Sequence, residues 1–370
     1  PVPKPVIRLA ARGGRMTGPN TLSTLVDAML MVVLAGYLLK VGQPVLLPIL
    51  AAVIVVYVLV NLSEALGRLP VIGRLPAALR RVLVLLAFTA ALFALTGVVV
   101  GTISEILAQA PRYQANIERL VAQMAEFIGV DDRPDWPAIR DATFGRFSVQ
   151  GVINTAFLNV TGIGSAVFLI IIYSAFLMAE RAGFANKLFT ALPDPRDAER
   201  TAAIIRDVNE RIGDYLAVKT LINVLLGSIS FVILWAMDVD FPLFWALLIG
   251  LLNYIPYVGS LVGVALPVLL SVVQFGELSR TIILAVLLTI AQVSVGNVIE
   301  PRLIGRRVNL SPFVVLVALA VWSSLWGVAG ALLAVPLTSM LAIVLSAFDA
   351  TRPIAILMAD RVMGAYRPDP

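Results

Sequence analysis

Polar side chains that could bind or move a solute occur inside otherwise apolar stretches of the chain. Lys219 and Asn223 lie four residues apart, so they share one helical face. A later stretch carries Gln292, Gly296, Asn297 and Glu300, which we expect along one side of a helix. Polar groups inside a membrane helix are costly and usually face the protein interior or a pathway. Both sets therefore predict a pathway for a small solute or an ion.

Glu300 is the best candidate for a carboxylate that gains and loses a proton. The alternative is a local ion pair with one of the arginines that follow it, Arg302, Arg306 or Arg307. We expect the Lys219 side chain to extend toward the membrane surface, as long cationic side chains do.

Several kinds of chemistry are excluded by residues that the chain lacks. It contains no Cys and no His, which removes thiolate nucleophiles, histidine bases and Cys/His metal sites. We find no phosphate-binding glycine loop, paired catalytic carboxylates or nucleophile elbow. The sequence therefore predicts no enzyme, no cofactor and no metal site.

The composition is that of a protein in a lipid bilayer. The chain is 59% hydrophobic and only 14% charged, against about 45–50% and about a quarter in soluble domains. Its apolar blocks reach the roughly 20 residues that cross a bilayer. We predict an all-α polytopic membrane protein with about eight membrane segments. Six are full spans, at about 22–39, 43–61, 82–101, 152–179, 217–237 and 280–299, and two are helical hairpins broken by Gly and Pro, at 242–275 and 312–347.

Basic residues between the apolar blocks indicate the orientation. They concentrate before the first span, after the second span and after the sixth span. Because basic loops stay in the cytoplasm, both termini are expected there. The basic residues form no stripe, so no nucleic acid is expected as a partner.

These patterns divide the chain into five segments. Residues 1–101 hold the first three membrane helices, and 102–151 form an extracytoplasmic helical hairpin with a kink at Pro111. Residues 152–216 hold the fourth membrane helix and a cytoplasmic amphipathic helix, 217–347 the transport core, and 348–370 a cytoplasmic tail. The segment 102–151 either packs on itself or serves as an oligomer contact or gate.

The two hairpins share a spacing pattern. Pro242/Pro312, Gly259/Gly327 and Pro267/Pro336 are offset by 68 to 70 residues. The charge pattern predicts that the first hairpin enters the membrane from the extracytoplasmic side and the second from the cytoplasmic side. This opposite topology is that of the inverted repeats in many secondary transporters. Chance similarity of two apolar helix pairs is the alternative.

The midpoints of both hairpins combine a helix break with polar residues, and such breaks survive in a membrane only against protein or a water-filled cavity. We predict that the pathway is lined by Asn253, Tyr254, Pro256, Gly259, Ser260, Lys219, Asn223, Gln292, Asn297, Glu300, Ser323 and Ser324. Hinge or packing roles are predicted for Gly263, Pro267, Gly296, Pro301, Gly327, Gly330 and Pro336.

Two segments, GLLNYIPYVGSLVG and GNVIEPRLIGRRVNLSPFVVLVALAVWSSLWGVAGALLAVPLT, resemble the hallmark segments of the bacterial autoinducer-2 exporter family, the PerM-like permeases. The resemblance implies a multi-spanning inner-membrane protein that exports small solutes as a homo-oligomer, with pentamers expected. The motif residues that carry over are Asn253, Pro256, Gly259, Gly263, Gly296, Asn297, Glu300, Pro301, Gly305, Ser311, Pro312, Gly327, Gly330 and Pro336. Ser260 stands where Pro is frequent, and Ser323 where Gly or an aromatic residue is frequent, so the substrate does not carry over.

Three functional hypotheses follow. The first is a secondary transporter that exports a small polar solute similar to autoinducer-2. The second is a sodium (or lithium)/proton antiporter in which Glu300 carries the proton. The third is a membrane scaffold without transport, built on 102–151 and 180–216.

Overall fold

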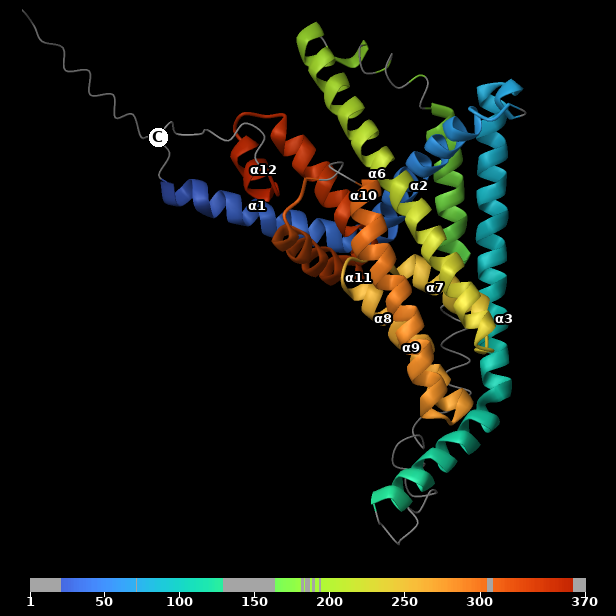
Figure 1. Ribbon diagram of the computed structural model, residues 1–370. Coiled ribbons are helices and arrows are strands. Elements are labelled where there is room, and N and C mark those ends of the chain that lie inside the picture. Colours follow the sequence, from blue (N-terminus) through green and yellow to red (C-terminus); the bar gives the residue numbers. More distant parts are fainter. Residues whose placement is uncertain are drawn as a thin grey trace, which may run out of the picture. The chain divides into compact units, whose positions relative to one another are not determined.

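The computed structural model describes residues 21–70, 72–128, 164–180, 183, 187, 190–192, 194–304 and 309–361. Every regular element in this part of the chain is a helix (Figure 1), so the predicted all-α polytopic membrane protein is confirmed. Among the described residues, six helices are long and apolar enough to cross a membrane: Gln43–Leu66, Ala77–Ile106, Pro195–Ala236, Val258–Phe275, Leu278–Ile304 and Pro312–Ser346. Shorter apolar helices cover Met29–Val41, Gly164–Glu180 and Pro242–Leu252.

The N-terminal helices belong to two separate units. Helix α1 (Thr21–Val41) lies in the first unit, residues 1–44, and the remaining elements lie in the second. In the second unit, α2 (Gln43–Leu66) packs Val56 and Leu59 against Val84 and Met178. The beginning of the predicted fourth span, residues 152–163, lies outside the described residues.

Helix α3 (Ala77–Ile128) continues far beyond the membrane. Its 52 residues correspond to roughly 80 Å of helix, against about 30 Å for a hydrocarbon core. The predicted extracytoplasmic helix is therefore an extension of the third span, with Pro111 inside it. Figure 1 shows the distal part of α3 turning away from its membrane part, as expected where Pro removes a hydrogen bond. The return half, residues 129–151, lies outside the described residues.

Helix α6 (Pro195–Ala236) joins the predicted amphipathic helix and the fifth span without interruption. Asp194 caps its start by accepting a hydrogen bond from the Arg196 backbone N–H, and Pro195 occupies the first turn, where its missing N–H costs nothing. The deeper part of α6 packs Ile222, Leu226 and Leu234 in the core shared with α7 and α9. A single rigid rod thus carries both Lys219 and Asn223.

The first predicted hairpin is present as two helices, α7 (Pro242–Leu252) and α8 (Val258–Phe275). The link between them ends at Tyr257, whose φ is 63°. The two arms meet at Gly259, where an added Cβ would lie 1.7 Å from the Leu252 carbonyl oxygen. Only a residue without a side chain permits this approach. Gly263 then lies against Ile249, and Pro267 is buried inside α8.

The sixth span contains an irregular turn. Helix α9 (Leu278–Ser294) is followed by a π-helical turn, η2 (Val295–Ile299), and by the short helix α10 (Glu300–Ile304). Pro301 lies inside α10 rather than ending a helix. It lies just after the π turn in the continuous helical segment Leu278–Ile304, and its missing N–H leaves one carbonyl of the preceding turn without a helical partner.

Helix α11 (Pro312–Ser346) is also folded back on itself. Its backbone is not helical at Trp326 and Gly327, and Gly327 has a φ of 61°. The Trp322 indole N–H donates to Thr338 Oγ1 at 3.0 Å, although sixteen residues of straight helix would span about 24 Å. The Ser311 side chain caps the start of α11. The second hairpin is therefore present too.

The two hairpins match in geometry as well as in spacing. Tyr257 and Gly327 are 70 residues apart, and both have positive φ. Gly330 approaches Trp322 as Gly259 approaches Leu252, because its Cβ would lie 1.9 Å from the Trp322 carbonyl oxygen. The counterpart of Gly259 is thus Gly330, and the expected match with Gly327 is wrong. Gly327 forms the break itself, and a Cβ there would meet nothing within 4 Å. The opposite orientation of the two hairpins stays a prediction.

The tip of the first hairpin packs against the second hairpin. Ile255 shares an apolar cluster with Ala318, Leu319, Ala331 and Ala334, and Leu252 lies at its edge. These residues come from both arms of α11. The broken backbone of the first hairpin is therefore covered by protein at Ile255, whereas Tyr257 and Val258 are exposed.

The C-terminal segment folds back on the start of the second hairpin. Helix α12 (Arg352–Met358) ends where the Met358 carbonyl accepts from the Ser311 N–H at 2.9 Å. Asn309 and the Arg361 backbone exchange two hydrogen bonds, at 2.9 and 3.0 Å. The predicted tail thus begins with a docked helix, and residues 362–370 lie outside the described part of the chain.

Replacing Gly259 or Gly330 with Ala should destabilise the fold. Each new Cβ would collide with a backbone carbonyl, so we expect a loss of about 1–3 kcal/mol or more and a lower Tm in detergent, followed by tryptophan fluorescence. Gly97→Ala is the control, since a Cβ at this helical position meets nothing within 4 Å. Equal stability of Gly259→Ala and Gly97→Ala would contradict the close-approach account.

Candidate functional site

A buried ion pair joins α6 to the end of the sixth span. Lys219 Nζ lies 2.5 Å from Glu300 Oε1, and the two side chains are 5% and 23% exposed. Lys219 therefore does not extend to the membrane surface, and the expectation that it does is wrong. Two charges in an apolar interior require each other, because either one alone would be costly. Glu300 pairs with a distant helix rather than with Arg302, and Arg306 and Arg307 lie outside the described residues.

The π-helical turn aligns the polar groups of the sixth span. In a regular α-helix, residues eight apart such as Gln292 and Glu300 point about 80° away from each other. A π turn accommodates one extra residue, so the two side chains behave as if seven apart and differ by only about 20°. Glu300 contacts Lys219 on α6, and Gln292 contacts Asn253 in the first hairpin. Asn297, inside the π turn, is exposed. Gly296 has open space around its Cα rather than a packing contact.

Three buried amide side chains connect α6, the first hairpin and α9, and we call Asn223, Asn253 and Gln292 the amide trio. Asn253 Nδ2 donates to Asn223 Oδ1 at 2.8 Å, and Gln292 Nε2 donates to Asn253 Oδ1 at 2.9 Å. All three residues are buried. The break of the first hairpin is thereby fixed to the two helices on either side of it.

The amide trio has two open ends. Within the described residues the Nδ2 of Asn223 and the Oε1 of Gln292 are buried and make no hydrogen bond of ordinary geometry, although the Asn223 amide lies close to the Tyr254 hydroxyl. An unpaired buried polar group costs about 1–3 kcal/mol, so natural proteins keep few of them. The arrangement offers an acceptor at Gln292 and a donor at Asn223, beside the Tyr254 hydroxyl, to a water molecule or a small polar ligand.

A pair of hydroxyl groups accompanies the amide trio. Thr220 Oγ1 and the Tyr254 hydroxyl are 2.7 Å apart. Thr220 also lies 2.7 Å from the Leu216 carbonyl, to which it donates its single proton. Tyr254 is therefore the donor to Thr220. Thr220 itself had no signal in the sequence, because Ser and Thr commonly bond the preceding helical turn.

The serines expected in the pathway bond to their own helices. Ser260 donates to the Tyr257 carbonyl at 2.8 Å, Ser323 to Ala320 at 3.2 Å and Ser324 to Val321 at 2.8 Å. None of these three acceptors belongs to the amide trio or the ion pair. Pro256 is half-buried in the link of the first hairpin, and Gly330 and Pro336 are buried in the second. The structure thus gathers Lys219, Asn223, Asn253, Tyr254, Gln292 and Glu300 from the predicted pathway.

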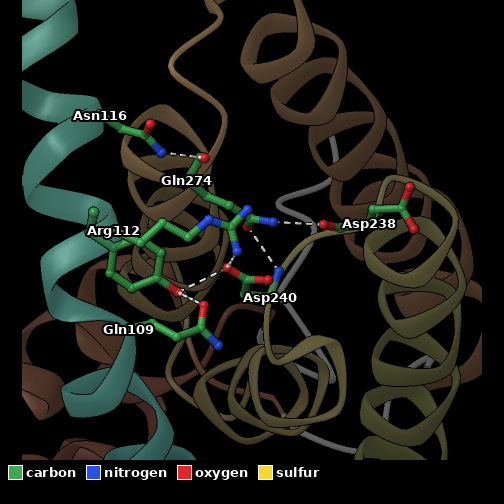
Figure 2. Close-up of polar contacts among 7 residues, drawn as sticks. Gln109, Arg112, Asn116, Asp238, Asp240 and Gln274 are labelled. Carbon is green, nitrogen blue, oxygen red and sulfur yellow. Dashed lines mark hydrogen bonds and ion pairs between the residues drawn. The ribbon is translucent and has the colours of Figure 1, made fainter.

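A second polar cluster, which the sequence did not reveal, lies between the α3 extension and the outer ends of the first hairpin (Figure 2). The Tyr113 hydroxyl donates to Asp240 Oδ2 at 2.9 Å, and Arg112 lies 3.8 Å from the same oxygen. Asn116 Nδ2 donates to the Gln274 carbonyl at 2.8 Å. No local sequence pattern connects Asp240 with Tyr113, because the two residues are 127 positions apart.

Tyr113 keeps its proton in this second cluster. Its burial, followed by its hydrogen bond to the Asp240 carboxylate, raises the pKa of the phenol above its ordinary value of about 10. A raised pKa means that the folded state favours the protonated phenol. The stability that the protonated Tyr113 contributes is therefore complete below pH 10, and it is lost only as the pH rises through the folded-state pKa. The Tyr113–Asp240 bond is therefore insensitive to phenol ionisation across the physiological range.

Removing one charge of the Lys219–Glu300 pair should destabilise the protein more than removing both. Glu300→Gln leaves the more deeply buried Lys219 unpaired, so we expect about 3–5 kcal/mol from it and a smaller loss from Lys219→Met. The double variant should recover most of the Tm in a thermal unfolding measurement in detergent. Losses that simply add in the double variant would contradict the ion pair.

Comparisons with known proteins agree on one family. The sequence profile of the AI-2E family transporter matches residues 28–350. The chain is 27% identical to the AI-2 transport protein TqsA of Escherichia coli K12 over 335 residues, which covers 90% of this chain and 94% of TqsA.

Two further relatives carry provisional names as transport proteins. One, from Haemophilus influenzae, is 28% identical over 90% of this chain and 94% of its own length. YhhT of Escherichia coli K12 is 29% identical over 75% of this chain and 78% of YhhT. With the family profile spanning most of the chain and the helices of a multi-pass membrane protein, this chain belongs to the AI-2E family and is a permease-type transporter.

Proposed function

We propose that this protein is a secondary transporter that exports a small polar solute similar to autoinducer-2 across the bacterial inner membrane. The observation that carries the proposal is the amide trio, which puts an open donor and an open acceptor beside a broken membrane hairpin. Such breaks mark the binding sites of many secondary transporters. The name of the relative TqsA supports the solute class.

The charges around the amide trio favour a neutral solute. Lys219 and Glu300 neutralise each other, so neither is left to hold an ion of the opposite charge. The open end at Asn223 is an N–H donor, which repels a cation, and the open end at Gln292 is a carbonyl, which repels an anion. A hydroxyl group accepts from the first and donates to the second. A small solute with several hydroxyl groups therefore fits both ends.

Orientation and assembly complete the proposal. Both termini lie in the cytoplasm, as the basic loops indicate. The protein works as a homo-oligomer, with a pentamer expected from the family resemblance.

A sodium (or lithium)/proton antiporter is the second candidate, and the Lys219–Glu300 pair favours it. The Glu300 side chain is 23% exposed and that of Lys219 is 5% exposed, so the carboxylate is the member of the pair that solvent reaches. In that mechanism a cation would replace the proton or the lysine at Glu300. Removing both charges should then abolish exchange.

Gln292→Met should weaken solute transport. The change keeps the length of the side chain but removes the open acceptor and the bond to Asn253, which together justify a loss of roughly tenfold or more in flux. The measurement is autoinducer-2 efflux from proteoliposomes at equal amounts of folded protein. Asn297→Ala is the control, because Asn297 is exposed and lies outside the amide trio. Unchanged flux in Gln292→Met would contradict the proposal.

The double variant Lys219→Met/Glu300→Gln separates the two candidate functions. An exporter of a neutral solute should retain measurable autoinducer-2 flux, since no charge of the pair touches the solute. An antiporter should lose pH-dependent sodium exchange in the same vesicles. If the wild-type protein exchanges sodium and the double variant does not, the antiporter is favoured.

A further inference from the structure

We propose that the second polar cluster is an outer clamp, which holds the first hairpin against the α3 extension and opens during each transport cycle. The outer clamp consists of Arg112, Tyr113 and Asn116 on α3, with Asp240 and Gln274 on the hairpin side (Figure 2). The proposal has two parts: the holding step, in which the clamp keeps the hairpin against α3, and the opening step, in which it releases the hairpin during transport. Only the opening step rests on the proposed transport function.

The central bond of the outer clamp is buried and charge-assisted. Tyr113 is 7% exposed, and its hydroxyl is 2.9 Å from Asp240 Oδ2 and 3.2 Å from Gln109 Oε1. A phenol has a single proton, so the closer and ionised oxygen receives it. Arg112, whose side chain is 60% exposed, adds a weak ion pair at the rim.

Gln274 holds the loop that presents Asp240. Its Nε2 donates to the Asp238 carbonyl at 2.7 Å, and its Oε1 accepts from the Asp240 N–H at 2.8 Å. This loop contains two left-handed residues, Asp238 and Phe241, with φ of 54° and 60°. Residues other than Gly adopt this conformation only where their surroundings enforce it. Backbone bonds at the end of α6, including the Val239 N–H donating to the Leu234 carbonyl at 3.0 Å, hold the left-handed Asp238. The Gln274 side chain then ties this loop to α8.

The outer clamp and the amide trio lie at opposite ends of the same helix. Gln274 is near the C-terminal end of α8, and Asn253 lies just before the N-terminal end. The 18 residues of α8 separate these ends by about 27 Å. The Asn116–Gln274 bond ties α3 directly to α8. The clamp thus prevents α8 from sliding along α3, so release of the clamp is the step that frees the hairpin as a whole.

Spin labels measure the clamp without any knowledge of the solute. The chain contains no Cys, so labels can be placed at Ala115→Cys and Leu278→Cys, both exposed and outside the clamp. Labelled protein is diluted with unlabelled protein in lipid nanodiscs, so that distances within one chain are measured. We expect Tyr113→Phe and Asp240→Asn to add or enlarge a population at longer distance.

Asp238→Asn is the matched control for the spin-label experiment. Asp238 takes part in the clamp through its backbone carbonyl, so changing its side chain should leave the distances as in the wild type. Identical distance distributions in the wild type, Tyr113→Phe and Asp240→Asn would overturn the holding step.

A reversible cross-link tests the opening step. Tyr113→Cys/Asp240→Cys, joined by a short bis-methanethiosulfonate reagent, replaces the clamp with a covalent bond. We expect autoinducer-2 efflux to fall at least tenfold and to return after reduction, while the efflux of each single cysteine variant is the same with and without the reagent. Undiminished efflux from cross-linked protein would overturn the opening step. Absence of efflux from wild-type protein would instead contradict the proposed function, and the holding step would still be decided by the spin labels.

Discussion

The side chain of Asn253 holds the broken first hairpin to α6 and α9 inside the membrane. A bilayer offers no water to a broken helix, so the freed polar groups must find partners within the protein. Asn253 stands at such a break, where it donates to Asn223 and accepts from Gln292. Its two bonds fix the tip of the first hairpin between α6 and α9. The π turn then carries the same polar face onward to Glu300 and its partner Lys219.

The two hairpins show how small residues permit this arrangement. Gly259 and Gly330 let the arms of each hairpin approach at backbone distance, and the tip of the first packs into the second through Ile255. The two hairpins contact each other through apolar residues, and the first hairpin makes its polar contacts with α6 and α9. The first hairpin thus has one face that packs on the second hairpin and one face whose polar groups contact α6 and α9. At its far end the outer clamp ties it to α3, so both ends are held by a few polar bonds.

Much of this fold follows from the sequence, because membrane spans need only length and hydrophobicity. The breaks at Asn253–Tyr257 and Trp326–Gly327 were predictable from Gly, Pro and polar residues in apolar runs. The continuity of α3 through Pro111 and of α6 through residue 217 was not, since local patterns do not show whether a helix continues out of the membrane. The partner of Glu300 was missed because a single π turn changes which residues share a face. The outer clamp was missed because it joins residues more than a hundred positions apart.

The central claim is that a neutral solute binds between the open ends of the amide trio. Its most direct test is an experimental structure of the protein in lipid nanodiscs, determined with and without autoinducer-2 at saturating concentration. The account predicts solute density within hydrogen-bonding distance of Asn223 Nδ2 and Gln292 Oε1, at a position that holds only water in the solute-free structure. Solute bound elsewhere, with these two atoms unchanged between the structures, would contradict it.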